Sequence, residues 1–348
     1  MVEDRLFCCE EFLMYRYLVD ETRTFRSDIK PFYFRENPEK YHINCVEDVA
    51  DAIQSYIQEI VSEGGKIGLA LSGGIDSAIL AKYVPKDTMT FTFRCVAPGT
   101  LDETSIAKTY ADLCGLEHTI VDVSWQDYLD SSKVLMAHKG APIHSIEPQI
   151  YKAASIAKEF GISYFLFGEN ADIIFGGMDG LLKKDWTFDE FVERYSYLNP
   201  ARIMKNGTQW LAPFEKYRQG SMIDFYGFIT KYFYLEANNS YENACVTAGV
   251  KYASPFNRMK LDVPLDYERI RRGDTKYMLR SLFNKLYPDL GQPKKIPMPR
   301  AVKQWLYNWN GPTRSEFLPN CIEGLNADQR WMVFILERFL NQIDSNEY

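Results

Sequence analysis

The feature that most constrains the fold of this 348-residue chain is an alternation of two hydrophobic periods that begins at residue 46. Apolar residues recur every three or four positions over 46–63, which is typical of an amphipathic helix, and a short apolar strand follows over 66–71. The pattern continues with a helix over 77–83, a strand over 89–93, a helix over 102–114, a strand over 118–123, helices over 126–137 and 147–160, and a strand over 162–167. Strands separated by helices at this spacing predict an α/β fold with a parallel sheet flanked by helices. In such a fold, ligands bind beyond the carboxyl ends of the strands.

The second half of the chain has a different pattern. Beyond about residue 180 the strand signal fades and helical periodicity dominates, as over 277–286 and 331–343. A proline-containing stretch over 30–41 gives the best boundary. We therefore expect an N-terminal segment over 1–45 and one domain over 46–348, which is divided into an α/β half over 46–180 and a mostly helical half over 181–348.

Charge and cysteine usage exclude several classes of protein. Forty basic against 47 acidic residues give a net charge of −7, which disfavours binding to nucleic acid. Seven scattered cysteines without a CxxC pair disfavour a disulfide framework or a zinc site, and no apolar run is long enough to span a membrane. We expect a cytoplasmic protein that binds neither nucleic acid nor membrane. The 15% aromatic content fits either an aromatic core or a sugar-like ligand.

The first segment with chemical character follows the strand over 66–71 and reads Ser72-Gly73-Gly74-Ile75-Asp76-Ser77. A glycine pair between a strand and a helix lets successive backbone N–H groups approach an anion, and the serines add hydroxyl donors. This arrangement suits a phosphate. The alternative is an ordinary turn in which Ser72 or Asp76 caps the helix. No GxxxxGK[ST] motif is present, which argues against a P-loop enzyme.

The second segment follows the strand over 162–167 and contains Gly168, Glu169 and Asp172. The carboxyl ends of parallel strands meet at one edge of the sheet, so these carboxylates and Asp76 are expected to share a cleft. Oxygen ligands beside phosphates are what Mg²⁺ prefers. Asp76 and Asp172 are therefore the candidate metal ligands.

These two segments resemble the pyrophosphate loop and the second signature of the asparagine synthetase superfamily, the ATP pyrophosphatases of PP-loop type. Matching stretches follow in order over roughly residues 46–310: Thr90-Phe91-Thr92-Phe93, Asp102-Glu103, Gly115-Leu116-Glu117-His118, Ser254-Pro255-Phe256, Thr275-Lys276-Tyr277-Met278-Leu279-Arg280 and Pro293-Lys294-Lys295. The resemblance implies an adenine nucleotide alpha-hydrolase-like fold with a helical C-terminal half. Residues 12–31 are similar to the tail of the glutaminase domain of full-length members. The family's nucleophilic cysteine is replaced by Val2, so we expect nitrogen to come from ammonia, another amine or a separate glutaminase subunit.

The resemblance implies a carbon–nitrogen ligase that uses ATP and Mg²⁺ in two steps. A substrate carboxylate is adenylated with release of pyrophosphate, and a nitrogen nucleophile then displaces AMP to form an amide. Lys276 and Glu169 are the implied catalytic residues, with Lys276 stabilising charge and Glu169 orienting it or accepting a proton. The implied residues for ATP and pyrophosphate are Leu71, Ser72, Gly73, Gly74, Asp76, Ser77, Phe93, Gly168, Lys294 and Lys295.

Departures from the family pattern bear on the substrate. Asn170, Ile173 and Met178 stand where Gly, an acidic residue and Tyr are usual, and residues 140–149 replace the usual acidic, proline-containing stretch. We therefore expect a carboxylate substrate other than aspartate, one candidate being a uronic-acid sugar of polysaccharide biosynthesis. The residues expected to recognise it are His144, Ser145, Glu147 and Gln149. The alternatives are a PP-loop enzyme that modifies a nucleobase or tRNA, and a degenerate relative that only binds nucleotide.

Overall fold

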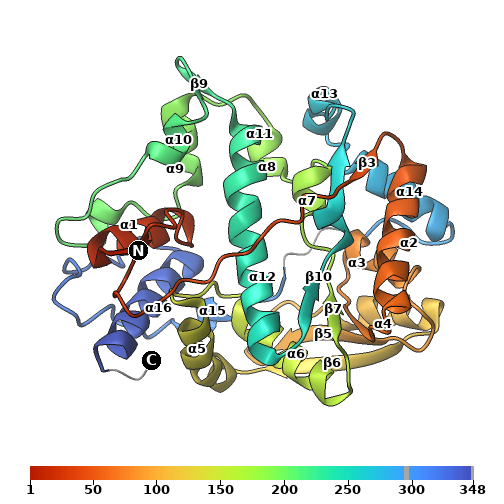
Figure 1. The fold of residues 1–348 in the computed structure, drawn as a ribbon, viewed down its shortest axis with the longest axis horizontal. Helices are drawn as coiled ribbons and strands as arrows, with labels where there is room; N and C mark the ends of the chain where they lie inside the picture. Colours follow the sequence, from red (N-terminus) through yellow and green to blue (C-terminus); the bar gives the residue numbers. More distant parts are fainter. Residues whose placement is uncertain (294–297, 346–348) are drawn as a thin grey trace.

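The computed structural model describes residues 1–293 and 298–345, and its centre is a five-stranded parallel sheet (Figure 1). In spatial order the strands are β10 (Lys251–Ala253), β7 (Tyr164–Leu166), β4 (Ile67–Ala70), β5 (Met89–Cys95) and β6 (Glu117–Val123). The four strands predicted from the apolar runs are confirmed, and each pairs in parallel with its neighbours. The fifth strand, β10, comes from the helical half and pairs with β7. The α/β fold class is thereby confirmed.

Helices cover both faces of this sheet. On one face are α2 (Val46–Ser62), α3 (Ile75–Ala81), α4 (Thr104–Cys114) and α14 (Tyr277–Leu286), which share a hydrophobic core with β4. On the other face are α5 (Trp125–Lys139), α6 (Glu147–Glu159) and α12 (Tyr234–Ala248). The helix bounds agree closely with those predicted from the periodicity, because each helix buries an apolar stripe against the sheet or a neighbouring helix.

Part of the second half of the chain packs around an aromatic core. Phe214 and Phe228 stack with ring centroids 4.5 Å apart, and Phe191 packs edge-on against Phe228. These contacts place much of the aromatic content in the protein interior. The remaining elements from residue 171 onward are α7 (Ala171–Ile174), α8 (Asp179–Leu182), α9 (Phe188–Tyr195), η1 (Pro200–Arg202), α10 (Ala212–Glu215), β8 (Arg218–Gln219), β9 (Met222–Ile223), α11 (Phe225–Phe228), η2 (Ile229–Phe233), η3 (Pro255–Arg258), β11 (Met259–Leu261), α13 (Tyr267–Arg271), α15 (Val302–Trp305) and α16 (Ala327–Asp344).

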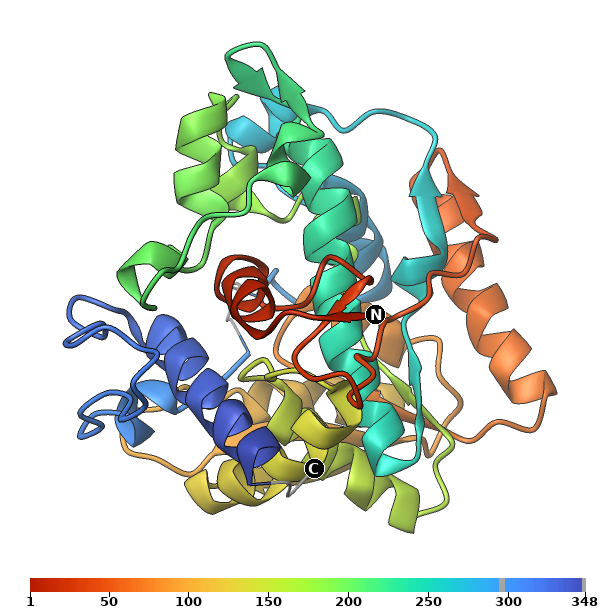
Figure 2. The same cartoon turned by 60° about the vertical axis from the view of Figure 1, so that its left-hand side comes forward.

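The N-terminal segment packs across both halves, and most of its first helix is buried (Figure 2). Its elements are β1 (Val2–Glu3), α1 (Arg5–Tyr15), β2 (Arg23–Thr24) and β3 (Tyr41–Ile43). Helix α1 packs against α16, and β3 pairs in parallel with β11. Whether residues 1–45 form a unit separate from residues 46–348 stays a prediction, as does the division at residue 180. Within the described residues, no helix combines the length and apolar character needed to cross a bilayer.

The strand order identifies where a ligand binds. The chain forms β4, β5 and β6 side by side, and then crosses back to place β7 on the opposite side of β4. The crevice outside the carboxyl ends of β4 and β7 is therefore the topological switch point, where α/β sheets bind their ligands. Both chemically distinctive segments of the sequence begin at this point.

Candidate active site

The loop after β4 folds around its two serines. Ser72 N donates to Ser77 Oγ at 3.0 Å, and Gly74 N donates to Ser72 Oγ at 3.1 Å. The two hydroxyl oxygens lie 3.0 Å apart. Helix α3 begins directly after Gly74, so its first N–H groups and its partial positive charge face the same crevice. The loop therefore has the form of an anion-binding turn.

Glu103, which is not among the predicted site residues, closes one side of this loop. Gly73 N donates to Glu103 Oε2 at 2.9 Å, and the Glu103 side chain is buried. Burial raises the pKa of this carboxyl, and the hydrogen bond from Gly73 opposes the rise. Glu103 thus fixes the loop from the side of α4.

The loop after β7 comes close to α3 because of two small or permissive positions. A Cβ on Gly168 would lie 2.9 Å from Asp76 Cβ, so only glycine lets the two loops meet. Asn170 adopts a left-handed conformation with φ 69°, which asparagine tolerates better than most residues. Its Nδ2 donates to Asn238 Oδ1 at 3.0 Å and to Asn257. Asn170, which stands where the family usually has glycine, is therefore in direct contact with Asn257.

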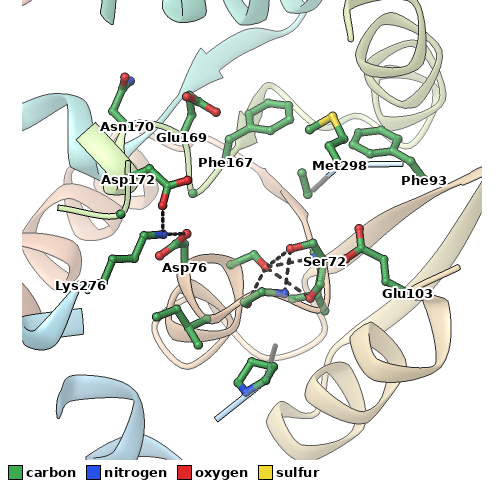
Figure 3. Close-up of a pocket in the computed structure, with 18 of the residues that line it drawn as sticks. Ser72, Asp76, Phe93, Glu103, Phe167, Glu169, Asn170, Asp172, Lys276 and Met298 are labelled. Atoms are coloured by element: carbon green, nitrogen blue, oxygen red, sulfur yellow. Dashed lines mark hydrogen bonds and ion pairs between the residues drawn. The ribbon is translucent and has the colours of Figure 1, made fainter. Parts of the chain in front are cut away.

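Lys276 joins the two loops at the centre of the site (Figure 3). Its Nζ lies 2.5 Å from Asp76 Oδ2 and 2.6 Å from Asp172 Oδ1. Burial alone would lower the pKa of Lys276, but the two carboxylates raise it above its ordinary value. The ammonium is thus held charged while its side chain is buried. A Cβ on Gly177 would overlap both Asp172 and Lys276, so glycine is needed there.

Glu169 has a distinct environment on the far side of Asp172 from Lys276 (Figure 3). Burial raises the pKa of its carboxyl to about 7, against hydrogen bonds from the Tyr241 hydroxyl and the Asn170 backbone that lower it. A carboxyl with a pKa near neutrality can both accept and donate a proton under physiological conditions. Sequence reasoning selected Glu169 but missed Tyr241, which lies on α12.

These groups line one cavity of about 270 Å³. Most of the predicted nucleotide residues lie on its wall, together with the two predicted catalytic residues: Leu71, Ser72, Gly74, Asp76, Ser77, Phe93, Gly168, Glu169, Asp172 and Lys276. Gly73 lies in the same loop, with its N–H directed to Glu103. Lys294 and Lys295 fall outside the described residues. Leu71 and Phe93 give the cavity an apolar wall at the ends of β4 and β5, which suits a flat base.

The cavity also contains residues to which the sequence analysis gave no role. They are Glu103, Phe167, Tyr241, Thr275, Arg280 and Met298. Arg280 is a cation whose Nε donates to the Thr275 carbonyl at 2.7 Å. It follows Lys276 by one helical turn, so the periodicity of α14 is a signal by which it could have been found.

The four residues predicted to recognise the substrate do not line this cavity. Glu147 is fully buried, and its Oε1 lies 2.5 Å from Lys139 Nζ. Ser145 and Gln149 are also buried, beneath Arg300 and beside Tyr128. His144 Nε2 lies 2.6 Å from Arg16 Nη1. Helix α12 packs against α6, and all four side chains are buried, so their role in substrate recognition stays a prediction.

The predicted Mg²⁺ ligands have the right chemistry for that ion. Mg²⁺ in nucleotide sites is held by one or two carboxylates together with phosphate oxygens and water. Asp76 and Asp172 supply two carboxylates that face a phosphate-type loop, and both are partly exposed to the cavity. Among the described residues, no cluster of three or more metal-ligating side chains occurs, so any metal here depends on phosphate for the rest of its ligands.

A model of the asparagine synthase family matches residues 48–316. The chain is 22% identical over 365 aligned positions to glutamine-hydrolysing asparagine synthetase 1 of Bacillus subtilis (strain 168), covering 87% of this chain and 56% of that protein. The chain thus spans little more than half the length of that curated relative.

Two solved structures are similar to parts of the chain. U34-tRNA thiolase NcsA from Methanococcus maripaludis is 14% identical, with 72% of this chain and 82% of that chain covered and a TM-score of 0.30. A predicted subunit of a tRNA methyltransferase from Methanocaldococcus jannaschii is 17% identical, with 31% of this chain and 55% of that chain covered and a TM-score of 0.21.

Proposed function

The chain belongs to the asparagine synthase family, and from this premise we propose that it is an ATP-dependent, AMP-forming amide ligase. The observation that carries the proposal is the position of Lys276, which is held charged between Asp76 and Asp172 beside the Ser72–Ser77 loop. A buried cation next to an anion-binding turn suits a reaction in which negative charge develops on phosphate and then on an acyl oxygen.

In the first proposed step, an oxygen of the substrate carboxylate attacks the α-phosphorus of ATP, and the bond to the β-phosphate breaks. The departing pyrophosphate is held by the Ser72–Ser77 loop, whose two serines line the cavity and whose last residues begin helix α3. Leu71 and Phe93 hold the base, and Arg280 supplies a further positive charge at the cavity wall. Lys276 stabilises the charge that builds up at the α-phosphate.

In the second proposed step, an amine attacks the acyl carbon and AMP leaves. The attacking nitrogen must lose a proton, and Glu169 is the carboxylate on the cavity wall whose pKa matches that task. Tyr241 positions Glu169 through its hydrogen bond. Lys276 stabilises the oxyanion of the tetrahedral intermediate.

Mg²⁺ fits this proposal as a second source of positive charge. Asp76 and Asp172 would hold it, and when bound it supplies neutralisation of phosphate charge. Since Lys276 already contacts both carboxylates, the lysine and the metal share them. Asp76 and Asp172 would therefore position a cation next to the nucleotide, whether that cation is the Lys276 ammonium or Mg²⁺.

For the substrates, we propose a carboxylic acid other than aspartate and a nitrogen donor that comes from outside this chain. The donor is ammonia, another amine or the product of a separate glutaminase subunit. A uronic-acid sugar remains our candidate acid, and the cytoplasm, where ATP is abundant, our proposed location.

The test is a screen for pyrophosphate and AMP release with ATP, Mg²⁺, ammonium and a panel of sugar and amino acids. We expect acid-dependent release, which Lys276→Met should abolish. Lys285→Met serves as a matched control because Lys285 lies on the same helix with an exposed side chain. Formation of ADP and phosphate in place of AMP and pyrophosphate would overturn the mechanism. Acid-independent adenylation of tRNA would favour the nucleic-acid alternative.

A further inference from the structure

A second cavity, of about 340 Å³, adjoins the first one across Gly177, which lines both. Lys276 and Asp172 lie directly against Gly177, so the second cavity begins at the reacting end of the first. The walls of this second cavity come from the N-terminal segment, α8, α9 and η2. Its lining residues are Arg16, Gly177, Met178, Gly180, Leu181, Arg194, Tyr195, Tyr197 and Phe233.

Arg16 is fixed at the inner wall of this second cavity. It ends α1 in a left-handed conformation, and its guanidinium carbon lies 3.7 Å from the centre of the Tyr197 ring. Its Nη2 contacts Tyr197 Oη at 2.5 Å and Glu236 Oε2 at 3.1 Å. Its Nε is buried and has no hydrogen-bond partner among the described residues. Arg16 thus has, within the described residues, an unpaired guanidinium donor on a side chain that lines the cavity.

Two further features of the cavity are also unused by the fold. The Tyr195 side chain is 4% exposed, and its hydroxyl has no partner within the described parts of the chain. Arg194 is exposed and makes no ion pair with any described carboxylate. A Cβ on Gly180 would lie 3.3 Å from Arg194 Nη2, so this guanidinium lies against α8, and both residues line the cavity. Phe233 ends the π-helical segment η2, a type of distortion that is frequent at functional sites.

The charge balance of the cavity favours an anion. Glu236 neutralises Arg16, whereas the charge of Arg194 is uncompensated among the described residues. His144 contacts Arg16 from behind, and burial together with Arg16, Arg300 and Lys139 lowers the pKa of His144 well below its ordinary value. The imidazole therefore adds no charge of its own at neutral pH.

We propose that this second cavity binds a second acidic group, a carboxylate or a phosphate, on the acid that the enzyme amidates. The inference rests on the proposed function, since it places the reacting carboxylate beside Lys276 and the second acidic group across Gly177. Arg16 Nε, the Tyr195 hydroxyl and Arg194 are the recognising donors. The substrate class is thereby narrowed to acids that carry a further anionic group, such as a phosphorylated sugar acid.

The test compares pairs of acids that differ only in the second anionic group. The probes are succinate and its monomethyl ester, phosphoglycolate and glycolate, and the anomeric phosphate of glucuronic acid and glucuronic acid itself. Binding in the presence of ATP and Mg²⁺ is measured by calorimetry, and pyrophosphate release is measured in parallel. We expect Arg194→Gln to weaken binding of the dianionic member of at least one pair about tenfold and to leave the monoanionic member unchanged. If Arg194→Gln weakens binding in the succinate pair, the second acidic group is a carboxylate, and if it weakens binding in a phosphate-containing pair, the group is a phosphate.

Matched variants keep the result interpretable. Arg202→Gln removes an exposed arginine that does not line the cavity, and it should change nothing. Tyr195→Phe removes a hydroxyl that no described group uses, so it should weaken binding without lowering the free energy of unfolding. If every dianionic acid binds Arg194→Gln and the wild type equally, the subsite is refuted even where pyrophosphate is released. If Arg194-dependent binding occurs without any pyrophosphate release, the subsite stands and the proposed reaction fails.

Discussion

The raised pKa of Glu169 predicts that its replacement by glutamine stabilises the protein at alkaline pH. The pKa of this carboxyl is 4.5 ordinarily and about 7 in the folded protein, chiefly because of burial. Folding therefore favours the protonated form. The stability contributed by that form is fully present below about pH 4.5 and is lost as the pH rises towards and through 7. Glutamine keeps a neutral, hydrogen-bonding side chain at every pH.

The size of the effect follows from the two pKa values. They differ by about 2.5, and each pKa unit corresponds to about 1.4 kcal/mol, which sets a ceiling of about 3.5 kcal/mol. Because Glu169 is only half-buried and lines an open cavity, solvent screening reduces this to about 1–2 kcal/mol. Glu169→Gln should therefore be more stable than the wild type by that amount at pH 8, with the difference vanishing near pH 4.5.

Urea denaturation at several pH values between 4.5 and 8 measures this difference. Glu159→Gln, at the exposed end of α6, is the matched control and should track the wild type throughout. The same Glu169→Gln protein should lose most of its amide-forming activity, so that stability and function change in opposite directions. A stability difference that is zero, or that does not vary with pH, would refute the reasoning.

Two further predictions concern a glycine of the site and a buried ion pair. Gly177→Ala should lower pyrophosphate release at least about 100-fold, because the new Cβ displaces Asp172. In Gly291→Ala the new Cβ meets no atom of the described residues within 4 Å, so this variant should retain activity. Steady-state kinetics on both variants decide this. Lys139→Met should lower the free energy of unfolding by about 3–5 kcal/mol in urea titrations, because it leaves the Glu147 carboxylate buried without its cation. Adding Glu147→Gln should restore much of this loss. If the single variant is as stable as the double variant, the argument is contradicted.

Much of the fold could be predicted from sequence because the signals are local. Five or more apolar residues at one period determine each main helix, and the loops at 72–77 and 168–172 follow directly from strand ends. Strand β10 could not be found in this way, since three residues, Lys251–Ala253, carry no measurable period. It is identified only by its pairing with β7.

The residues of the site also differ in whether a local sequence signal identifies them. Lys276 and Asp172 could be found because they lie in recognisable segments, but Tyr241 reaches Glu169 from a helix that is distant in sequence and has no motif of its own. Residues 144–149 are a different case, because polar side chains in a loop-like segment suggest a ligand site. In the structure α12 presents a buried polar face that pairs with them, as Asn243 does with Glu147. Polar pairing across helices cannot be read from one segment alone.

The late arrival of β10 has a consequence for how the chain is made. In the finished sheet Leu166 of β7 is paired with Ala253, a residue 87 positions later. During synthesis at roughly 5–20 residues per second, the free edge of β7 therefore stays open for on the order of ten seconds. An unpaired strand edge beside an apolar core is a template for association between nascent chains. Expression of this protein should accordingly depend on chaperones that shield the emerging sheet until residue 253 has left the ribosome, and ribosome-bound chains arrested before β10 should associate with one another more readily than chains arrested after it.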